Sequence, residues 1–452
     1  MTIGLIIKNI QMKNILRLSV LLMVLLTLGS CKKYLDIEPT GRVIPTTADD
    51  FRALLTSAYA GFPAQKSLVS LRTDELVLDE YGTDFPGLRD IYKWNDNTPD
   101  AITYPYPYVG LYNTIFYANE VIANVEAKAG KNTATDQMKG EAYLLRAYTH
   151  FELLNLYAKP YNKATAATDR GIALALKMDL EQNYTLSTVA EVYNQILADI
   201  AEGQKFLNVN NWESGKNYRF SIRSAWALQA RVYEYMGDWA NTLSTVQKVL
   251  AVNRDLQDLN VSGALLPNHY QSVENILSLE EAFNSLVSNS TYISEHLLGI
   301  YDHTNDLRFA MYFSKSGGDY VSKKGNSDAL KITFRNGEMY LIQAEAALQT
   351  GKPELALQSL LDLKAKRLKP AYYATERTRI SALGNAALMQ EIISEREREL
   401  ALEGHRWFDL RRYGQPSMTH SVNFEDFTLR QNDPRYTIRF PQSAIANNPN
   451  LQ

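Results

Sequence analysis

The sequence has little of what a metal centre or a disulfide framework needs. It contains one cysteine among 452 residues, so no disulfide can form within the chain and no thiolate cluster can hold zinc. The six histidines are scattered, and none stands in an HExxH pair or a similar spacing. Asp302, Asn305 and Asp306 offer oxygen atoms that calcium prefers, but such residues in a polar loop more often face water. We therefore predict no cofactor and no metal.

The chain also lacks a strong charge and an obvious linker. Its net charge is −3 and the charged residues form no basic run, which argues against nucleic acid as a partner. No stretch rich in proline, glycine and serine divides the sequence. We therefore expect residues 49–452 to form one large body, although this exceeds the usual length of a single domain.

An apolar run near the N-terminus is too short to span a bilayer as a helix. Residues 1–30 contain no acidic residue, and three basic residues precede the apolar run at 18–28, which is typical of a secretory signal. The single cysteine, Cys31, follows directly in LGSC, the spacing of a bacterial lipobox. A more typical signal starts at Met12, so the chain has two candidate start codons.

The lipobox predicts a lipid anchor. The Cys31 thiol would take a diacylglycerol and the new α-amine an acyl chain such as palmitate, and each buried methylene group adds about 0.8 kcal/mol to membrane binding. Residues 31–48 are expected to form an extended tether, because Pro39 and Gly41 discourage helix. The alternative is a chance thiol behind an ordinary signal peptide.

Segments with similar patterns of alanine and large apolar residues predict helical repeats. They are EAYLLRAYTHFELLNLYA from Glu141, AWALQARVYEYMGDWANTL from Ala225 and EMYLIQAEAALQTGKPELAL from Glu338. In the last two, Gly237 and Gly351 stand where a tight turn would join two helices. Each segment is interpreted as a helix, a turn and a second helix, which is the tetratricopeptide plan. Such repeats indicate a scaffold that exposes an interaction surface.

The stretch EGHRWFDLRR, residues 403–412, is the natural candidate for catalysis, because glutamate, histidine and aspartate are the usual general acids and bases. However, carboxylates among arginines have lowered pKa values, which suits a general acid poorly. The acids also stand three residues from arginines, a spacing that favours ion pairs along a helix. Every acid of the stretch therefore has a structural partner. The expected pairs are Glu395–Arg398, Arg396–Glu399, Glu403–Arg406 and Asp409–Arg412.

The longer stretch EIISERERELALEGHRWFDLRRYG closely resembles the C-terminal signature of the SusD/RagB family, the surface glycan-binding lipoproteins of Bacteroidetes nutrient-uptake systems. The resemblance covers essentially the whole mature chain, in family order. Similar stretches are the lipobox with KKYLDIEPTG, TDEL at Thr73, LYNTIFYANEVI at Leu111, EAYLLRAYTHFELLNLYAKPYN at Glu141, EMYLIQAEAAL and FPQSAIANNPNLQ.

The resemblance implies a mostly α fold, with tetratricopeptide-like helix pairs and a loop-rich, ligand-binding face. It implies a structural role for His405 and Asp409. It also implies a protein that is no enzyme and that is lipid-anchored at the outer membrane on the cell surface. There it would capture oligosaccharide and pass it to a TonB-dependent, SusC-like transporter. The alternatives are a surface lipoprotein enzyme that acts on glycan and a periplasmic tetratricopeptide-like scaffold for other proteins.

The ligand site is expected on aromatic residues beside planar polar groups, because sugar rings pack on aromatic faces and amide, carboxylate and guanidinium groups orient around hydroxyls. The segment WNDNTPDAITYPYPYVG, residues 94–110, has this composition, and its prolines should display successive tyrosine rings outward. The family resemblance implies that a later insertion between the helical repeats supplies further aromatic residues to the site, here Tyr292, Tyr301 or Tyr320. The alternative is that this aromatic cluster covers core. The candidates are Asp74, Arg89, Trp94, Asn95, Tyr104, Tyr106, Tyr108, Tyr292, Tyr301 and Tyr320.

Overall fold

The computed structural model describes residues 45–178 and 184–451. The predicted signal peptide, Cys31 and the tether up to residue 44 lie outside the described residues. By its internal contacts, the chain from Thr46 onward is one compact unit. Its elements are mostly helices, which confirms the predicted fold class. Within the described ranges, no helix combines the length and apolar character that crossing a bilayer requires.

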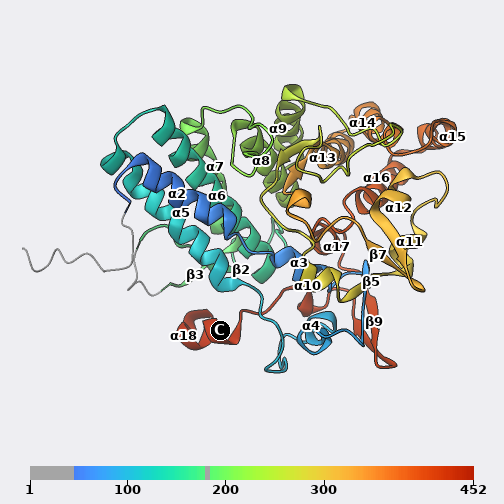
Figure 1. Ribbon diagram of the computed structural model, residues 1–452, viewed down its shortest axis with the longest axis horizontal. Helices are drawn as coiled ribbons and strands as arrows, with labels where there is room; N and C mark the ends of the chain where they lie inside the picture. Colours follow the sequence, from blue (N-terminus) through green and yellow to red (C-terminus); the bar gives the residue numbers. More distant parts are fainter. Residues whose placement is uncertain (1–44, 179–183, 452) are drawn as a thin grey trace, which may run out of the picture. The chain divides into compact units, whose positions relative to one another are not determined.

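Long helices build the N-terminal part of this unit: α2 (Ala48–Ala60), α5 (Tyr108–Ala129), α6 (Thr133–Tyr157) and α7 (Val189–Phe206). Helix α5 packs on α2 and α6, and α6 packs on α7 (Figure 1). Helices α2, α6 and α7 begin at capping boxes, in which Thr47, Asn132 and Thr188 accept hydrogen bonds from backbone N–H groups of the first turn. Most of α6 is buried, so it is the central helix of this group.

The helical hairpins predicted from Ala225 and Glu338 are present. Gly237 joins α8 (Ile222–Met236) to α9 (Trp239–Val252), and Gly351 lies between α13 (Asn336–Gln349) and α14 (Pro353–Ala365). The two glycines have φ angles of 68° and 72°, the left-handed region in which any side chain would be strained. Helix α9 also packs on α13, so the hairpins stack as tetratricopeptide-like repeats do.

The tight turn predicted after the segment from Glu141 is wrong. This segment lies in α6, which runs to Tyr157 without a glycine turn. The described part of the connection to α7 contains the paired strands β2 (Arg170–Ala173) and β3 (Leu186–Thr188). Helix α7 still packs on α6, so the helix pair forms across a long connection.

Short elements make up the rest of the described chain. The remaining strands pair as antiparallel two-stranded ladders: β1 (Leu76–Leu78) with β5 (Thr291–Ile293), β4 (Asn275–Leu277) with β8 (Phe334–Arg335), β6 (Phe313–Ser316) with β7 (Asp319–Ser322), and β9 (Met418–Val422) with β10 (Glu425–Leu429). The short helices before α13 are α3 (Gln65–Ser70), α4 (Phe85–Tyr92), α10 (Ser285–Ser288), α11 (Glu295–Gly299), α12 (Leu307–Tyr312) and η2 (Asp328–Leu330). The C-terminal part has α15 (Pro370–Ser381), α16 (Asn385–Glu399), α17 (Arg406–Arg412), η3 (Pro434–Tyr436), α18 (Gln442–Asn447) and η4 (Pro449–Leu451).

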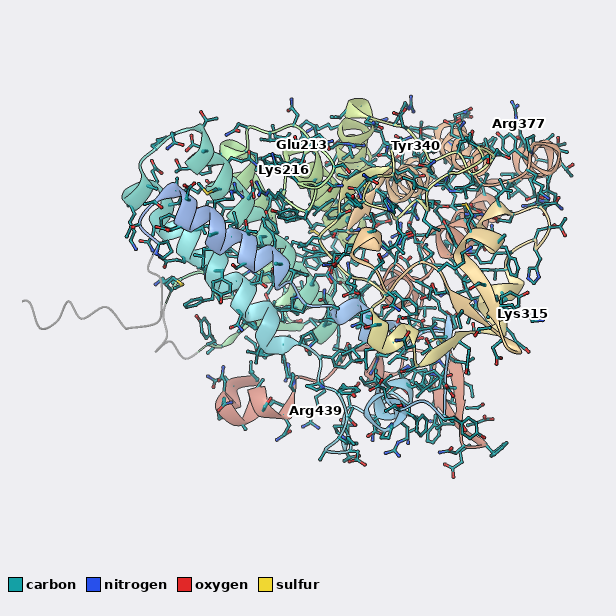
Figure 2. All side chains as sticks on the ribbon, viewed as in Figure 1. Glu213, Lys216, Lys315, Tyr340, Arg377 and Arg439 are labelled. Carbon is teal, nitrogen blue, oxygen red and sulfur yellow. The ribbon has the colours of Figure 1, made fainter. Side chains whose placement is uncertain are left out.

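The buried apolar side chains form two clusters. The larger cluster joins the long helices and the C-terminal segments. The smaller cluster lies among the short elements and includes Leu76 of β1, Ile293 of β5 and Leu402 after α16. Side chains fill the spaces between the ribbons in both regions (Figure 2). The loop-rich region therefore has a core of its own, and β1 and β5 are packed against it.

Glycines let α6 and α7 approach closely. A Cβ atom added at Gly203 of α7 would lie 3.0 Å from the carbonyl oxygen of Gly140 in α6 and would also run into the side chain of Leu144. A Cβ atom at Gly140 would lie 2.9 Å from the backbone nitrogen of Leu207. The crossing therefore has no room for a methyl group on either helix.

We predict that Gly203→Ala lowers the free energy of unfolding by about 1–3 kcal/mol, because the added methyl group overpacks the α6–α7 crossing. Gly299→Ala in α11 is the matched control, since a Cβ atom there meets nothing within 4 Å. Urea unfolding of the wild type and both variants measures the effect. Equal stability of the two variants would contradict the close approach.

Candidate ligand-binding site

The charged side chains of EGHRWFDLRR make buried contacts in the turn after α16 and in α17. Glu403 binds Arg335 at 2.8 Å, and Asp409 binds Arg396 at 2.8 Å. His405 is buried, and burial holds its pKa well below the usual 6.5. These contacts give the motif a structural role, as we predicted from its arginines.

Glu399, the last residue of α16, lies at the centre of a buried ion network. Its carboxylate accepts hydrogen bonds from Arg308 at 2.9 Å, Arg335 at 2.6 Å and Arg367 at 2.7 and 2.9 Å. All four side chains are at most 1% exposed. Burial alone would raise the pKa of Glu399, but the guanidinium groups outweigh burial and hold this pKa well below 4.5.

The three-residue spacing identified some ion pairs and missed others. The predicted Arg396–Glu399 pair is wrong, because Glu399 binds the arginines of the network. The predicted Glu403–Arg406 pair is also wrong, because Glu403 binds Arg335, which comes from β8. The pairs that form as predicted are Glu395–Arg398 at 3.0 Å and Asp409–Arg412 at 3.1 Å.

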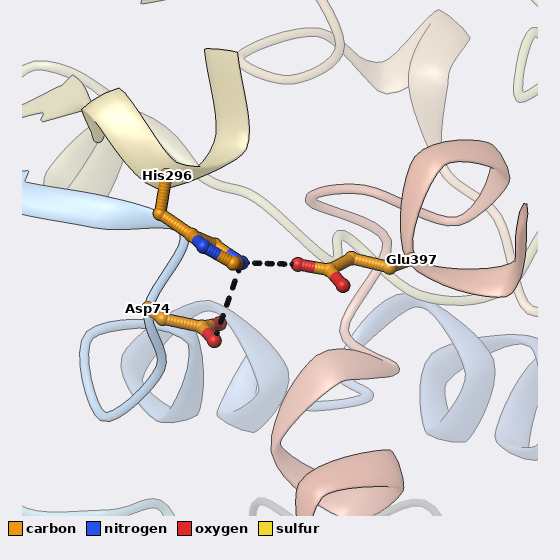
Figure 3. Close-up of side chains that lie close together, drawn as sticks. All are labelled: Asp74, His296 and Glu397. Carbon is orange, nitrogen blue, oxygen red and sulfur yellow. Dashed lines mark hydrogen bonds and ion pairs between the residues drawn. The ribbon is translucent and has the colours of Figure 1, made fainter. Parts of the chain in front are cut away.

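A cluster of charged side chains holds the loop before β1 against the motif. Arg406 donates to both oxygens of Asp74, at 2.7 and 2.6 Å, and its Nη1 lies 3.1 Å from Glu397. His296 Nε2 lies 2.6 Å from Glu397 and 3.5 Å from Asp74 (Figure 3). The hydrogen bond to Glu397 raises the pKa of His296.

This cluster is also the place where the described residues could hold a metal ion. One ligand atom each from Asp74, His296 and Glu397 lies within 4.8 Å of the others. Arg406 already pairs with both Asp74 and Glu397, so the two carboxylates have a cationic partner within the protein. Sequence spacing gave no sign of it, because the three residues come from distant segments.

The oxygen atoms suggested for calcium have other partners. The Asp302 carboxylate accepts hydrogen bonds from the backbone N–H groups of Thr304 and Asn305, at 2.9 and 2.8 Å. Asp306 is buried and binds Arg308 through both oxygens, at 2.9 and 2.7 Å. Asp306 therefore neutralises an arginine and does not face water as expected.

Trp94 was predicted to contact the ligand, but it lies in the core. Its side chain is 0% exposed and stacks on His420, with the ring centres 4.1 Å apart. The indole N–H donates to the carbonyl oxygen of Arg72 at 3.1 Å. Tyr92 covers the other face of His420. The ring joins the α4 region to β9 and offers no face to a ligand in this structure.

The other predicted residues between 89 and 108 mainly hold their segment against the body. Pro105 and Pro107 do keep the chain out of helix until α5 begins. Tyr104 and Tyr106 are displayed outward only in part, because both rings are half-buried against the smaller core cluster. Their contacts are Arg89 with Asp100, Asn95 with Thr98, Tyr104 with Asp84, Tyr106 with Arg72, and Tyr108 with Tyr157.

The tyrosines of the later insertion differ in exposure. Tyr301 is 5% exposed and its hydroxyl donates to the carbonyl oxygen of Arg398, so this side chain is part of the core. Tyr320 in β7 is half-buried and lies opposite Lys315 of β6, which is labelled in Figure 2. Tyr292 in β5 is half-buried between two buried neighbours. Tyr292 and Tyr320 therefore keep a surface that a ligand can reach.

Tyr292 belongs to the outer side of the β1–β5 ladder. Its register partner is Val77 of β1, which is 42% exposed, while the flanking residues of both strands are buried. The Tyr292 hydroxyl donates to Asp79 at 3.3 Å, and the Asp79 charge raises the pKa of Tyr292. Asp79 also accepts the backbone N–H of Tyr81, whose side chain is 97% exposed. We call Val77, Asp79, Tyr81 and Tyr292 the β1–β5 face.

An open groove of about 540 Å³ lies elsewhere, beside the end of α2. This volume is within the usual range of small-ligand sites. Tyr59, Tyr218 and Tyr270 line it, and none of them was predicted. Its polar groups already have partners, since Asn217 donates to Tyr270 and Asp328 pairs with Lys331 at 2.7 Å. The β1–β5 face contains Tyr292, which the sequence predicted, beside the 97%-exposed Tyr81, so we treat it as the candidate site.

Comparison with known proteins gives the family. A family model described as starch-binding and associating with the outer membrane matches residues 33–234, and a model described as the SusD family matches residues 294–452. The chain belongs to the SusD family. A SusD-like protein of Formosa agariphila is 23% identical, over 88% of this chain and 92% of that protein.

Solved structures of the SusD superfamily have the same fold. A protein of Bacteroides thetaiotaomicron is similar with a TM-score of 0.74 at 20% identity, covering 89% of this chain and 98% of that one. A protein of Bacteroides fragilis gives 0.75 at 21% identity, covering 90% and 99%. A laminarin-binding SusD-like protein gives 0.61 at 17% identity, covering 82% and 92%. The match of the SusD family model to residues 294–452 confirms the family resemblance of the C-terminal motif.

We predict that Glu399→Gln lowers the free energy of unfolding by about 3–5 kcal/mol at neutral pH, because it removes the carboxylate that three buried guanidinium groups share and leaves them with fewer counter-charges. The folded-state pKa of Glu399 is depressed, so its contribution is present above 4.5 and is lost as the pH falls below that value. The difference between wild type and variant should therefore shrink as the pH falls from about 5 to about 3.

Urea unfolding at several pH values measures this difference. Glu376→Gln is the control, because Glu376 pairs with the half-exposed Arg379 and should contribute less than about 1 kcal/mol. A Glu399→Gln deficit that stays constant with pH would contradict the assignment.

Proposed function

We propose that this SusD-family protein is a lipid-anchored binding protein of the outer cell surface. It captures oligosaccharide and passes it to a partner TonB-dependent transporter. The observation that carries the binding part is the β1–β5 face, where the Tyr292 hydroxyl and the backbone N–H of Tyr81 both donate to the carboxylate of Asp79. Support for a carbohydrate ligand also comes from the starch-binding description of the matching family model and from the laminarin-binding relative.

The chemistry of the β1–β5 face suits a sugar. An aromatic ring offers a flat apolar surface to the C–H groups of a pyranose, while a carboxylate accepts hydrogen bonds from its hydroxyl groups. Tyr292 is oriented by its hydrogen bond to Asp79, and Val77 beside it adds apolar surface. A ring held in place in this way loses little entropy when a ligand binds.

A glycan-degrading enzyme is the second candidate, and it would need an accessible carboxylic acid with a raised pKa. Burial raises the pKa of Glu75 to about 7 and that of Glu234 to about 7. Both side chains are 1% exposed, and Glu75 accepts the backbone N–H of Leu402. No substrate can reach these two acids in this structure, which supports binding without hydrolysis.

We predict that Tyr292→Ala weakens binding of laminarin or soluble starch by about 1–3 kcal/mol, as the loss of a stacking ring does elsewhere. The melting temperature should stay nearly unchanged, because Tyr292 is half-exposed. Tyr117→Ala is the control, since Tyr117 is an exposed tyrosine on α5. Isothermal titration calorimetry measures both. Unchanged affinity of Tyr292→Ala would place the ligand elsewhere, and the groove lined by Tyr218 would then be tested.

We predict that Cys31→Ala abolishes lipidation and releases the protein from membranes in cells that lack the partner transporter. Cys31 is the one cysteine of the chain, so no second thiol can take the lipid. Mass spectrometry of the N-terminal peptide and fractionation of cells measure the two effects. Retention of the variant in the membrane fraction would refute the anchor.

A further inference from the structure

The β9–β10 hairpin ends in a strained aromatic tip. The pair Val422 and Glu425 closes the ladder and leaves Asn423 and Phe424 as a two-residue loop. Both have positive φ angles, 51° and 65°, as a type I′ turn requires, and such turns favour Asn-Gly. A phenylalanine in the glycine position crowds its own backbone. The Phe424 side chain has a relative exposure of 104%, so no packing within the described chain offsets this strain.

The tip touches the loop that leaves the β1–β5 face. The Asn423 N–H donates to Glu80 Oε1 at 2.5 Å. In the sequence, Phe424 follows Asn423 and Tyr81 follows Glu80. The side chains of Phe424 and Tyr81 are both almost fully exposed. Asp79, on the other side of Glu80, binds the Tyr292 hydroxyl. The loop after β1 and the hairpin tip are therefore held together beside two exposed rings, and the same loop carries the hydrogen-bond partner of Tyr292.

We propose that the β9–β10 tip is a second wall of the glycan site, in which Phe424 and Tyr81 contact sugar rings beyond the one at Tyr292. This inference rests on the proposed function and extends its site to the C-terminal hairpin. Strain at an exposed position persists where the side chain serves something other than folding. A single exposed apolar residue is ordinary, but here two exposed rings, one of them at a strained position, follow residues that are hydrogen-bonded to each other.

The charges around this surface select the class of glycan. The carboxylates of Asp79, Glu80 and Glu425 border the rings and disfavour sulfated or uronic-acid groups. The occupant is therefore a neutral oligosaccharide long enough to reach from Tyr292 to the hairpin tip.

The experiment replaces Phe424 in the full mature protein and measures binding and stability together. Phe424→Gly removes both the ring and the strain, so it should weaken binding of laminarin or soluble starch by at least about 5-fold while leaving the melting temperature equal or higher. Phe424→Trp keeps an aromatic face and should retain most of the affinity. The anionic glycan alginate should bind the wild type more weakly than the neutral glycans.

Gln415→Gly is the matched control. Gln415 also has a positive φ, 47°, but lies in the turn after α17 and outside the surface described here. Its replacement should relieve backbone strain as Phe424→Gly does and should leave glycan affinity unchanged. If Gln415→Gly also loses glycan affinity, added backbone flexibility and not the loss of the Phe424 ring explains the effect of Phe424→Gly. This result would overturn the proposed role of the Phe424 ring.

The remaining outcomes separate this inference from the proposed function. Failure of the wild type to bind any of the three glycans contradicts both. If the wild type binds and Tyr292→Ala loses affinity while Phe424→Gly does not, only the second wall is wrong. A Phe424→Gly protein with a lower melting temperature shows a structural ring and overturns the inference. The inference is also overturned if Phe424→Gly keeps its glycan affinity but no longer co-purifies with an outer-membrane β-barrel protein. The Phe424 ring would then contact a protein and not a sugar.

Discussion

The buried contact between Glu399 and three arginines fixes how the loop-rich region sits on the helical repeats. Arg308 comes from α12, Arg335 from β8, Arg367 from the turn after α14, and Glu399 from the end of α16. Burying these charges is costly, and the cost is offset only when every partner is present. The four segments therefore cannot separate one at a time, and the insertion between α9 and α13 is held in one position.

The EGHRWFDLRR motif and the turn before it also contact the segment that leads into the candidate site. The backbone N–H of Leu402 donates to Glu75, and Arg406 binds Asp74, so both residues before β1 are held by the turn after α16. The hydroxyl of Ser294, just after β5, donates to the carbonyl oxygen of Asp74. Both strands of the β1–β5 face are thus fixed at one end. The EGHRWFDLRR motif has a composition that suggests catalysis. In the structure it helps to position the β1–β5 face, although none of its residues belongs to that face.

Local signals in the sequence predicted the local structure well. Gly237 and Gly351 marked helical hairpins, because a left-handed turn between two apolar helices has a recognisable composition. The ion pairs were predicted only in part, because the strongest partners of Glu399 come from segments far along the chain. The burial of Trp94, a predicted ligand-binding residue, was missed for the same reason. His420, which buries its ring, lies in a C-terminal hairpin that no local pattern connects to it.

Aromatic composition alone cannot tell a core ring from a binding ring, as Tyr292 and Tyr301 show. Both are tyrosines of the same insertion, and both donate a hydrogen bond from the hydroxyl group. In β5, side chains alternate between the two sides of the ladder, so Tyr292 points outward while Thr291 and Ile293 are buried. Tyr301 follows a short helix and turns into the smaller core cluster. The register of β5 against β1 therefore decides which tyrosine can meet a ligand, and register depends on a pairing partner that a single sequence does not reveal.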